Sequence, residues 1–243
     1  MKIVFMGTPD FSVPALEELA KVHQVAAVVT QQDRPKGRGH KMQYTPVKEK
    51  ALELNIPVYQ PEKVKNPEFV DILREINPDV IVVIAFGQIL SKEILDLPKY
   101  GCINVHASLL PKYRGAAPIQ WAVIDGEEET GVTTMYMAEG LDTGDVIDTA
   151  VIKLDEKETG GSLFDKLAIE GGKLIVETLS KLENGTATRT PQDDEKSSYA
   201  GKITKELGQI DFTKPAVTIE RLIRGLNPWP SAYTTLDGKA MKV

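Results

Sequence analysis

Short apolar runs alternate with helical spacings in the first 100 residues of the chain. The runs at 2–6, 24–30 and 79–87 are almost wholly apolar, and "DVIVVIAFG" shows no polar face along its middle. Between them, apolar residues recur with helical spacing in "PALEELAK" and in "PEFVDILREIN". Strands without a polar face are typical of parallel sheets that helices cover on both sides. The pattern therefore predicts a doubly wound, Rossmann-like α/β fold with a mostly parallel sheet.

The pattern changes after residue 101. The run "CINVH" ends a further strand, and after a loop and a helix come two β-rich runs, at 131–139 and 145–154. Only "GLDTG" separates these two runs, and so short a link with two glycines predicts a hairpin with Asp142 near its tip. Helical spacing then continues from 162 to 182, which predicts a long helix packed on the sheet despite two adjacent glycines.

Three units follow from this reading. Residues 1–183 form the α/β domain, and the polar, turn-rich residues 184–202 are typical of a linker. Residues 203–243 contain one helical pattern, around "VTIERLIRGL", and the start of a hairpin at "LDGK". About forty residues are too few to bury a core alone, so this second unit is either docked on the first or cut short.

Charge limits what the chain can bind. Among its 243 residues, 35 are acidic and 29 basic, so the net charge of −6 repels a polyanion unless basic side chains gather locally. Residues 33–48, "DRPKGRGHKMQYTPVK", contain such a gathering. Composition alone favours a solvated loop here, but a basic loop on the ligand side of a sheet could also hold phosphates.

Several classes of site are disfavoured. The single cysteine, Cys102, leaves no disulfide framework and no cysteine cluster for a metal, and its apolar neighbours favour a buried filler over a nucleophile. His23 and His40 are too far apart in sequence to suggest a shared metal site, so we expect none. The first turn, "MGTPDF", lacks the three glycines of a dinucleotide fingerprint. No run approaches the ~20 apolar residues of a membrane span or forms a signal peptide, so we expect a cytoplasmic protein without a membrane partner.

Asn104 and His106 are the strongest candidates for chemistry. They end a strand where α/β proteins bind ligands, and the two-residue period of a strand points both to one face. An amide donor and a protonated imidazole together would stabilise an oxyanion. A carboxylate near the imidazole would keep it charged and help to remove a proton from an attacking amine; Asp142 is the best candidate, and Asp145 is the alternative. Taken alone, the Asn/His pair fits a buried core histidine and a turn asparagine equally well.

Five segments together resemble the methionyl-tRNA formyltransferase family along essentially the whole chain: "FMGTPDF", "TQQDRPKGRG", "NVHASLLPKYRGAAPIQWAVIDGE", "TGVTTMYMAEGLDTGDV" and "IRGLNPWPSAY". The segments "SLLPKYRG" and "DRPKGRG" are the most specific. The resemblance implies an enzyme of translation initiation that transfers a formyl group from 10-formyltetrahydrofolate to the methionyl amino group of initiator Met-tRNA.

The resemblance also implies roles for individual residues. The catalytic triad falls on Asn104, His106 and Asp142. The folate cosubstrate is expected to contact three stretches: Ser108, Leu109, Leu110 and Pro111; Phe86, Gly87, Gln88, Ile89 and Leu90; and Met137, Ala138, Glu139, Gly140 and Leu141. The tRNA is expected to contact Arg34, Lys36, Arg38 and Lys41, with Arg38 reaching the end of the acceptor stem. Lys112 and Arg114 suit the glutamate tail of folate, tRNA phosphates or a salt bridge at the rim.

Members of this family continue past the "DGK" hairpin into a β-barrel of OB type, so residues 203–243 are interpreted as the incomplete start of a tRNA-binding domain in a monomeric enzyme. Three rival functions stay open. One is formyl transfer to glycinamide ribonucleotide or an amino sugar, which the "DRPKGRG" and "LNPWPSAY" segments argue against. The others are release of the formyl group to water, and a folate- or RNA-binding module with an inactive site.

Overall fold

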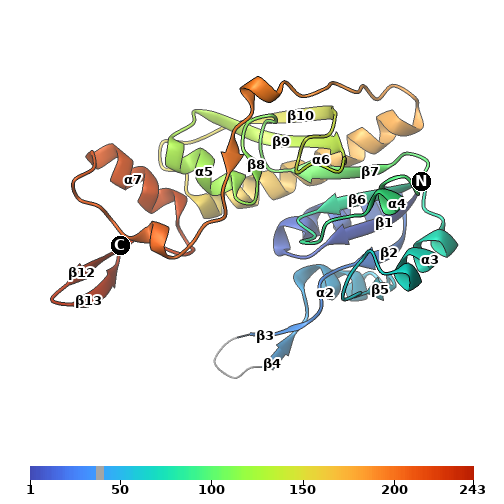
Figure 1. Ribbon diagram of the computed structural model, residues 1–243, viewed down its shortest axis with the longest axis horizontal. Helices are drawn as coiled ribbons and strands as arrows, with labels where there is room; N and C mark the ends of the chain where they lie inside the picture. The colour runs from blue at the N-terminus through green and yellow to red at the C-terminus, as the bar shows by residue number, and fades with distance from the viewer. Residues whose placement is uncertain (37–40) are drawn as a thin grey trace.

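The computed structural model describes the backbone of residues 1–36 and 41–243. Its centre is a seven-stranded sheet in the order β10-β9-β7-β6-β1-β2-β5 (Figure 1). The strands are β1 (Lys2–Gly7), β2 (Gln24–Val29), β5 (Val58–Tyr59), β6 (Val80–Ile84), β7 (Cys102–His106), β9 (Glu129–Tyr136) and β10 (Val146–Lys153). Strands β5, β2, β1, β6 and β7 run parallel, whereas β9 pairs antiparallel with both β7 and β10. The predicted mostly parallel sheet is confirmed. β9 and β10 form the predicted hairpin, but their connection runs over residues 137–145 and is therefore longer than the predicted "GLDTG" link.

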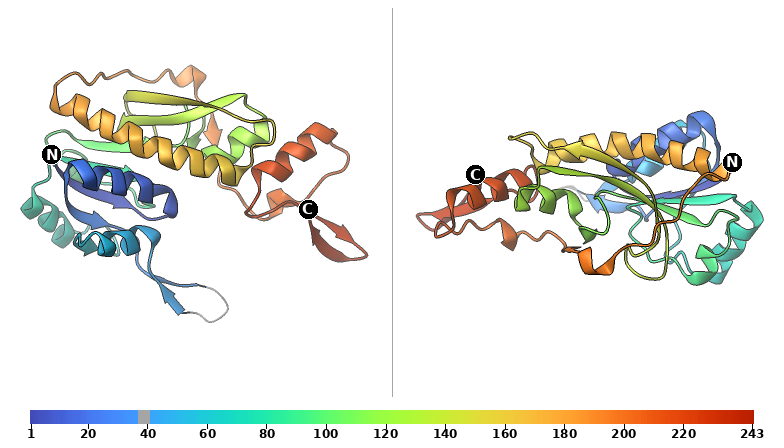
Figure 2. Two further views of the ribbon diagram at one scale, coloured as in Figure 1. Left: turned by 180° about the vertical axis from the view of Figure 1, so that it is seen from behind. Right: turned by 90° about the horizontal axis from the view of Figure 1, so that it is seen from above.

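Helices cover both faces of the sheet. The helices are α1 (Val13–Val22), α2 (Pro46–Glu53), α3 (Pro67–Ile76), α4 (Lys92–Leu95), α5 (Pro118–Asp125), α6 (Gly160–Glu183) and α7 (Ala216–Gly225), with 3₁₀ turns at Asp10–Ser12, Asp194–Lys196 and Glu206–Gly208. One apolar cluster joins the sheet to α1, α2 and α6, and a second joins its other face to α3 and α4. Figure 2 shows the long α6 lying along the sheet.

The adjacent glycines in α6 have a packing reason. The helix begins at a capping box, in which Thr159 accepts a hydrogen bond from the backbone N–H of Ser162 and the Ser162 hydroxyl accepts one from the N–H of Thr159. A Cβ atom at Gly172 would lie 3.2 Å from backbone atoms at the start of α1. The glycine therefore permits the close approach of α6 to α1, which offsets the poor helix propensity of this residue.

Strand β7 divides its side chains between the two apolar clusters. Ile103 and Val105 are buried under α1 and α6, whereas Cys102 belongs to the cluster beneath α3 and α4. Because side chains alternate along a strand, Asn104 and His106 lie on the same face as Cys102. The predicted common face of these two polar residues is confirmed by this alternation.

The segment predicted to be a linker lies along the α/β domain. The backbone of Thr190 exchanges hydrogen bonds with Val146, and β11 (Tyr199–Ala200) pairs in parallel with β8 (Arg114–Gly115). Figure 1 shows this orange segment leaving α6, passing β10 and β9, and descending beside β8. Its polar composition is that of a linker, but its backbone is bound to the domain.

The C-terminal unit is docked on the first domain. Helix α7 packs against α5, and Ala117, Ile203 and Leu226 form a small buried cluster between them. The indole N–H of Trp121 donates a hydrogen bond to the carbonyl of Gly201 at 2.7 Å. The predicted hairpin is present as β12 (Tyr233–Leu236) and β13 (Lys239–Lys242), with positive φ angles at both turn residues, Asp237 and Gly238. The OB-type barrel stays a prediction.

A second hairpin lies in the basic stretch, where the sequence predicted only a loop. Strands β3 (Arg34–Lys36) and β4 (Lys41–Gln43) pair antiparallel. Prolines and glycines in this stretch obscure the alternation that indicates strands. Arg38, proposed to contact tRNA, lies outside the described residues.

Within the described part of the chain, no helix combines the length and apolarity needed to cross a membrane.

Candidate active site

His106 is held at the end of β7 by one of its two ring nitrogens. The residue is 7% exposed, and its Nε2 lies 2.8 Å from the carbonyl oxygen of Tyr113. A carbonyl can only accept a hydrogen bond, so Nε2 carries a proton and donates it. The other nitrogen, Nδ1, lies 3.7 Å from Oδ2 of Asp142. The imidazole therefore presents Nδ1, and not Nε2, to the proposed catalytic carboxylate.

Asp142 lies in the loop between β9 and β10, in a backbone conformation that suits few residues. Its φ angle is +53°, in the left-handed region that Asp and Asn tolerate better than most side chains. Gly144 follows because a Cβ there would lie 1.7 Å from the carbonyl oxygen of Tyr136. The backbone N–H of Gly115 donates to Asp142 Oδ2 at 2.8 Å. These constraints aim the carboxylate, whose side chain is 12% exposed, at His106.

Asn104 completes the predicted triad on β7. It pairs with Met135 of β9 and Val83 of β6, and its side chain is half-buried on the same face as His106. Among the residues that the structure describes, none forms a hydrogen bond with its side-chain amide. The amide is thus available to a ligand beside the imidazole. That arrangement fits the proposed oxyanion site better than a core histidine beside a turn asparagine.

Asp145, the alternative carboxylate, is engaged elsewhere. Its Oδ2 accepts a hydrogen bond from Nε of Arg189 at 3.2 Å, and the Arg189 guanidinium stacks on the ring of Tyr136. This surface ion pair engages the carboxylate of Asp145 away from His106. The geometry favours Asp142 as the partner of His106.

The loop after His106 is shaped by the hydroxyls of Ser108 and Thr133. Ser108 is fully buried, and its Oγ donates to the carbonyl of Lys112 at 2.6 Å. Thr133 Oγ1 donates to the carbonyl of Ser108 at 2.6 Å and accepts from the N–H of Leu110 at 3.2 Å. The Ser108 side chain therefore stabilises the loop, which leaves the half-buried Leu109 and Pro111 as the more accessible part of this predicted folate contact.

The other two predicted folate-binding stretches share an apolar cluster. Phe86 and Leu90 are buried in the cluster that contains Cys102, and Met137 packs against it. Gln88 supports the first stretch, since its Oε1 accepts from the N–H of Val64 at 2.7 Å. The remaining residues are largely exposed, including two large apolar side chains: Gly87, Ile89, Ala138, Glu139, Gly140 and Leu141. The two stretches are thus held together while keeping apolar surface free for a flat ring.

The two basic residues whose roles the sequence left open form salt bridges. Lys112 forms a salt bridge with Glu127 at 3.2 Å, and Arg114 forms one with Asp194 at 2.7 Å. Both fit the rim salt bridge that was one of the alternatives.

Cys102 is 2% exposed, and its burial raises the pKa of the thiol to about 12. The interpretation of Cys102 as a buried filler is confirmed, because a thiol that stays protonated is a poor nucleophile.

The basic hairpin borders a pocket at the carboxyl ends of β1, β2 and β6. Arg34 of β3 lines this pocket, together with Thr8, Pro9, Gln31, Gln32, Pro35, Gln43, Tyr44, Thr45, Pro46, Ala85, Phe86 and Gly87. In the register of the hairpin, Lys36 pairs with Lys41. The structure therefore brings the basic stretch to the ligand side of the sheet, next to the Phe86 wall.

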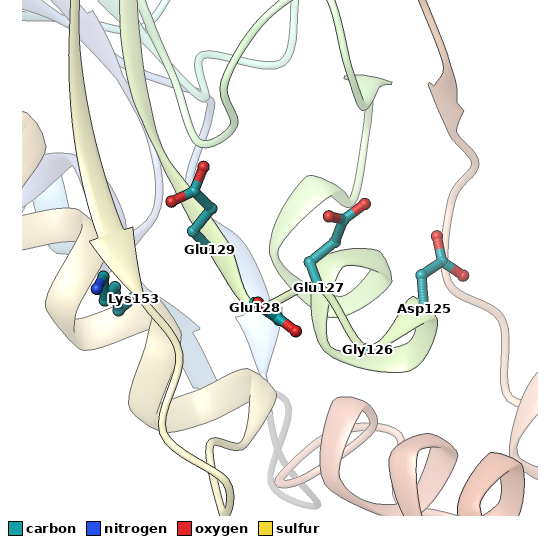
Figure 3. Close-up of a pocket in the computed structure, with 6 residues that line it drawn as sticks. All are labelled: Asp125, Gly126, Glu127, Glu128, Glu129 and Lys153. Carbon is teal, nitrogen blue, oxygen red and sulfur yellow. The ribbon is translucent and has the colours of Figure 1, made fainter.

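A second hollow, at the turn between α5 and β9, is acidic. Figure 3 shows Asp125, Glu127, Glu128 and Glu129 gathered around this turn, with Lys153 on the neighbouring β10. Lys112, which pairs with Glu127, and Arg221, which donates to the carbonyl of Asp125, also lie at this turn. The four carboxylates still outnumber the cations, and such an excess of negative charge disfavours a polyanion. This side of the molecule therefore does not suit the phosphates of a nucleic acid.

Two contributors to the site gave no usable signal in the sequence. The Tyr113 carbonyl orients His106, and any residue at this position would supply a carbonyl. Gln192 hydrogen-bonds the backbone of the Asp142 loop at 2.8 Å from within a polar, linker-like segment.

Among the described residues, no cluster of histidine, cysteine, aspartate or glutamate side chains could hold a metal ion.

Comparison with known families agrees with this fold. Residues 1–179 match the formyl transferase family, and residues 202–243 match the formyl transferase C-terminal domain. The chain therefore belongs to the formyl transferase family. The methionyl-tRNA formyltransferase of Agathobacter rectalis is 65% identical to it, and that of Clostridioides difficile is 59% identical; each alignment covers 100% of this chain and 79% of the relative. The predicted resemblance to methionyl-tRNA formyltransferases is confirmed.

Solved structures of more distant proteins share the fold. The N-formyltransferase from Helicobacter canadensis, in complex with folinic acid and dTDP-3-aminofucose, superimposes with a TM-score of 0.73 at 22% identity, over 98% of this chain and 85% of that protein. A sugar N-formyltransferase from a Shewanella species gives a TM-score of 0.75 at 19% identity, over 100% of this chain and 96% of that one. At such identities the likeness establishes the fold.

Proposed function

We propose that this enzyme transfers the formyl group of 10-formyltetrahydrofolate to the methionyl amino group of initiator Met-tRNA, and that Asn104, His106 and Asp142 catalyse the transfer. Relatives named methionyl-tRNA formyltransferase, 53–65% identical over the whole chain, support the reaction. The observation that carries the catalytic assignment is the approach of His106 Nδ1 to Asp142 Oδ2 at 3.7 Å beside the half-buried Asn104.

The walls around this pair suit the formyl donor. The side chains of Ile89 and Leu141 are exposed and supply apolar surface, and Met137 packs against the cluster that contains Phe86 and Leu90. A planar pteridine gains from burial against such surface at roughly 25 cal/mol per Å². The bound donor supplies an activated formyl carbon, and the residues on β7 act on the oxygen of that group.

Asn104 and His106 stabilise the negative charge that forms on this oxygen. As the uncharged methionyl amine attacks the formyl carbon, the Asn104 amide and the protonated Nδ1 of His106 donate hydrogen bonds to the developing oxyanion. Donors that are already oriented cost no reorganisation when the charge appears. The hydrogen bond from His106 Nε2 to the Tyr113 carbonyl supplies this orientation.

Asp142 acts on the imidazole and on the amine. Its negative charge, 3.7 Å from Nδ1, stabilises the protonated imidazole. It also accepts the proton that the amine must lose once it has attacked, directly or through water. The bond between the formyl carbon and N10 of the folate then breaks, N10 takes up the proton held by Asp142 or one from water, and tetrahydrofolate leaves the formylated amine. The step needs neither a metal ion nor a covalent intermediate.

The tRNA approaches from the basic hairpin in this proposal. Arg34 and Lys36 belong to β3 and Lys41 to β4, which lie on the same side of the sheet as the carboxyl ends of its parallel strands, and Arg38 follows Lys36 by two positions in the sequence. The excess of carboxylates at the α5–β9 turn disfavours tRNA phosphates on that part of the surface (Figure 3). We further expect the enzyme to act as a monomer in the cytoplasm.

Incubation with 10-formyltetrahydrofolate labelled in the formyl group tests this function against its rivals. Parallel reactions contain initiator Met-tRNA, glycinamide ribonucleotide, an amino sugar nucleotide or buffer. Label in acid-precipitable tRNA, and in no other acceptor, supports the proposal. Label in a small acceptor, release of free formate, or no transfer with retained folate binding would each replace it with one of the other functions.

A further inference from the structure

Gln192 lies in the segment between the two domains, and its side chain reaches the loop that bears Asp142. Its Nε2 donates hydrogen bonds to the carbonyl oxygens of Asp142 and Gly144, both at 2.8 Å. Its Oε1 accepts from Nε and Nη2 of Arg114, at 3.0 and 2.9 Å. A single side chain thus joins the catalytic loop to the strand that follows His106.

These contacts use the whole hydrogen-bonding capacity of an amide. A primary amide has two N–H donors and two lone pairs on its oxygen, and Gln192 engages all four. Arginine can only donate and carbonyls can only accept, so the amide has one workable orientation. A glutamate would keep the acceptor for Arg114 but lose both donors, and a methionine of similar size would lose everything. The position therefore requires an amide of this length.

The conformation of the loop that bears Asp142 is fixed by residues outside the loop. Residues 138–141 and Thr143 are exposed, and Asp142 adopts a left-handed conformation that an exposed loop does not enforce by packing. Gln192 fixes the backbone of this loop on both sides of Thr143. The Gly115 N–H fixes the Asp142 carboxylate at 2.8 Å. Backbone and side chain of the proposed catalytic aspartate are thus held by separate partners.

The same interdomain segment also positions Gly115, whose N–H donates to Asp142. In the pairing of β8 with β11, the N–H of Arg114 donates to the carbonyl of Ser198 and that of Ala116 to the carbonyl of Ala200, each at 2.9 Å. Alternate N–H groups of a strand point in opposite directions, which turns the N–H of Gly115 toward Asp142. Gly115 allows the close fit, because a Cβ there would lie 2.6 Å from the Tyr199 ring.

His106 depends on this segment as well. The N–H of Tyr113 donates to Ser198 Oγ at 2.9 Å, and the carbonyl of Tyr113 accepts from His106 Nε2. Residues 190–200 therefore support both His106 and Asp142 through hydrogen bonds to the segments that hold these two residues. Among these contacts, only the hydrogen bonds of Gln192 run directly from a side chain of this segment to the backbone of the catalytic loop.

We infer that Gln192 is a positioning residue for formyl transfer: it sets the distance and direction between Asp142 and His106 by clamping the catalytic loop to Arg114. This inference rests on the catalytic roles proposed above for His106 and Asp142. Displacing a reacting group by about 1 Å commonly costs on the order of 10²-fold in rate. Loss of the clamp acts on the chemical step, whereas the basic hairpin that meets the tRNA lies on other strands.

Gln192→Met in the full chain tests the inference. We expect kcat to fall by roughly 10- to 100-fold, with the KM for initiator Met-tRNA within about twofold of the parent. The pH profile of kcat should also shift, because it reports the imidazole and carboxylate that the clamp aligns. Glu195→Ala is the matched control: Glu195 is an exposed residue of the same segment, and we expect its variant to retain the parent kcat and profile.

Gln192→Glu separates positioning from stability. It keeps the acceptor that binds Arg114 and makes that pair ionic, which partly offsets the two lost donors. Its melting temperature should therefore fall less than that of Gln192→Met, while kcat falls as for Gln192→Met. Wild-type kcat and pH profile in either folded variant would overturn the inference, as would a loss of kcat that disappears once activity is expressed per folded molecule. Asp142→Asn in the same assay identifies the failing step: if this variant is inactive while the Gln192 variants are fully active, only the positioning role is wrong, and if it is active, the catalytic assignment itself is wrong.

Discussion

The carbonyl of Tyr113 accepts a hydrogen bond from Nε2 of His106 at 2.8 Å, and this contact decides which ring nitrogen of His106 can act on a substrate. Because Nε2 is occupied, Nδ1 is the nitrogen left to meet Asp142 and the developing oxyanion. The side-chain nitrogen of asparagine falls near the position of Nδ1, and that of glutamine near Nε2. The two amide substitutions therefore distinguish the roles of the two ring nitrogens.

His106→Gln should lower kcat by roughly 10²- to 10³-fold, because it retains the contact with Tyr113 and removes the donor at the reacting oxygen. His106→Asn keeps a donor near the position of Nδ1, so we expect it to retain about tenfold more activity than the glutamine variant. Single-turnover formylation of Met-tRNA measures both. Greater activity in the glutamine variant would assign the chemistry to Nε2 instead.

Asp142→Asn should reduce kcat by about 10²-fold or more while leaving the fold intact, because the amide cannot take up the proton from the amine. Asparagine tolerates the left-handed conformation at this position, and its side-chain oxygen can still accept from the Gly115 N–H. Thermal melting and far-UV circular dichroism should therefore match the parent. Formylation at the parental rate would remove Asp142 from the mechanism.

Much of the site followed from strand periodicity. The two-residue spacing of Asn104 and His106 predicts a common face, and the two glycines around Asp142 predict a hairpin, although its connection is longer than "GLDTG". Both patterns arise because side-chain direction and turn conformation depend on local sequence. The placement of Asp142 beside His106 did not follow from strand pairing alone. Tyr136, at the end of β9, lies opposite Ile103, so the loop after β9 must turn back along β7 to bring Asp142 to His106.

The rest depends on contacts between distant parts of the chain that leave no local pattern. The segment from 184 to 202 has the composition of a linker because its side chains are mostly solvated, yet its backbone pairs with β8 and β10. Backbone hydrogen bonds such as those of Ser198 and Tyr113 are independent of most side chains. Gln192 is one polar residue among many in "TPQDDEK", and only the partners around it reveal its role.

Arg38→Ala should raise the KM for initiator Met-tRNA by about tenfold, because an arginine that reaches the acceptor end contributes roughly 1–3 kcal/mol to recognition. Folate binding should stay nearly unchanged, since the predicted folate contacts lie on other segments. Steady-state kinetics with each substrate varied in turn measures the two effects. Lys21→Ala, at an exposed lysine paired with Glu18, is a control for loss of one positive charge. Equal losses for both substrates would contradict a role in tRNA recognition.

Cys102 should resist thiol reagents in the folded enzyme. Its burial, followed by the negative charge of Asp96, raises the pKa of the thiol to about 12, so almost no thiolate is present at pH 8. We expect no reaction with 5,5′-dithiobis(2-nitrobenzoate) over a time in which the guanidinium-unfolded chain reacts completely. One equivalent of rapid reaction in the native enzyme would show that the β7 face opens to solvent.

Glu158→Gln should lower the free energy of unfolding near pH 7 by roughly 1–3 kcal/mol. The Glu158 side chain is 1% exposed and accepts hydrogen bonds from Lys166 Nζ at 2.6 Å, from the hydroxyl of Ser162 and from the backbone N–H of Asp155. A glutamine in its place leaves part of this donor set unpaired. Urea denaturation measures the difference, and Asp155→Asn is the control, because Asp155 pairs with the same lysine but is largely exposed and should matter less.

The effect of Glu158→Gln should also depend on pH in one direction. Burial opposes ionisation of Glu158, but the hydrogen bonds from Lys166, Ser162 and Asp155 outweigh it and lower the pKa of the carboxyl. A carboxyl whose pKa is lower in the folded state stabilises the fold fully above its ordinary pKa of about 4.3 and loses that contribution as pH falls through the lowered value. The difference between parent and variant should therefore be largest at pH 6–8 and shrink below about pH 4. A difference that grows on acidification would show that the carboxyl is protonated in the native enzyme.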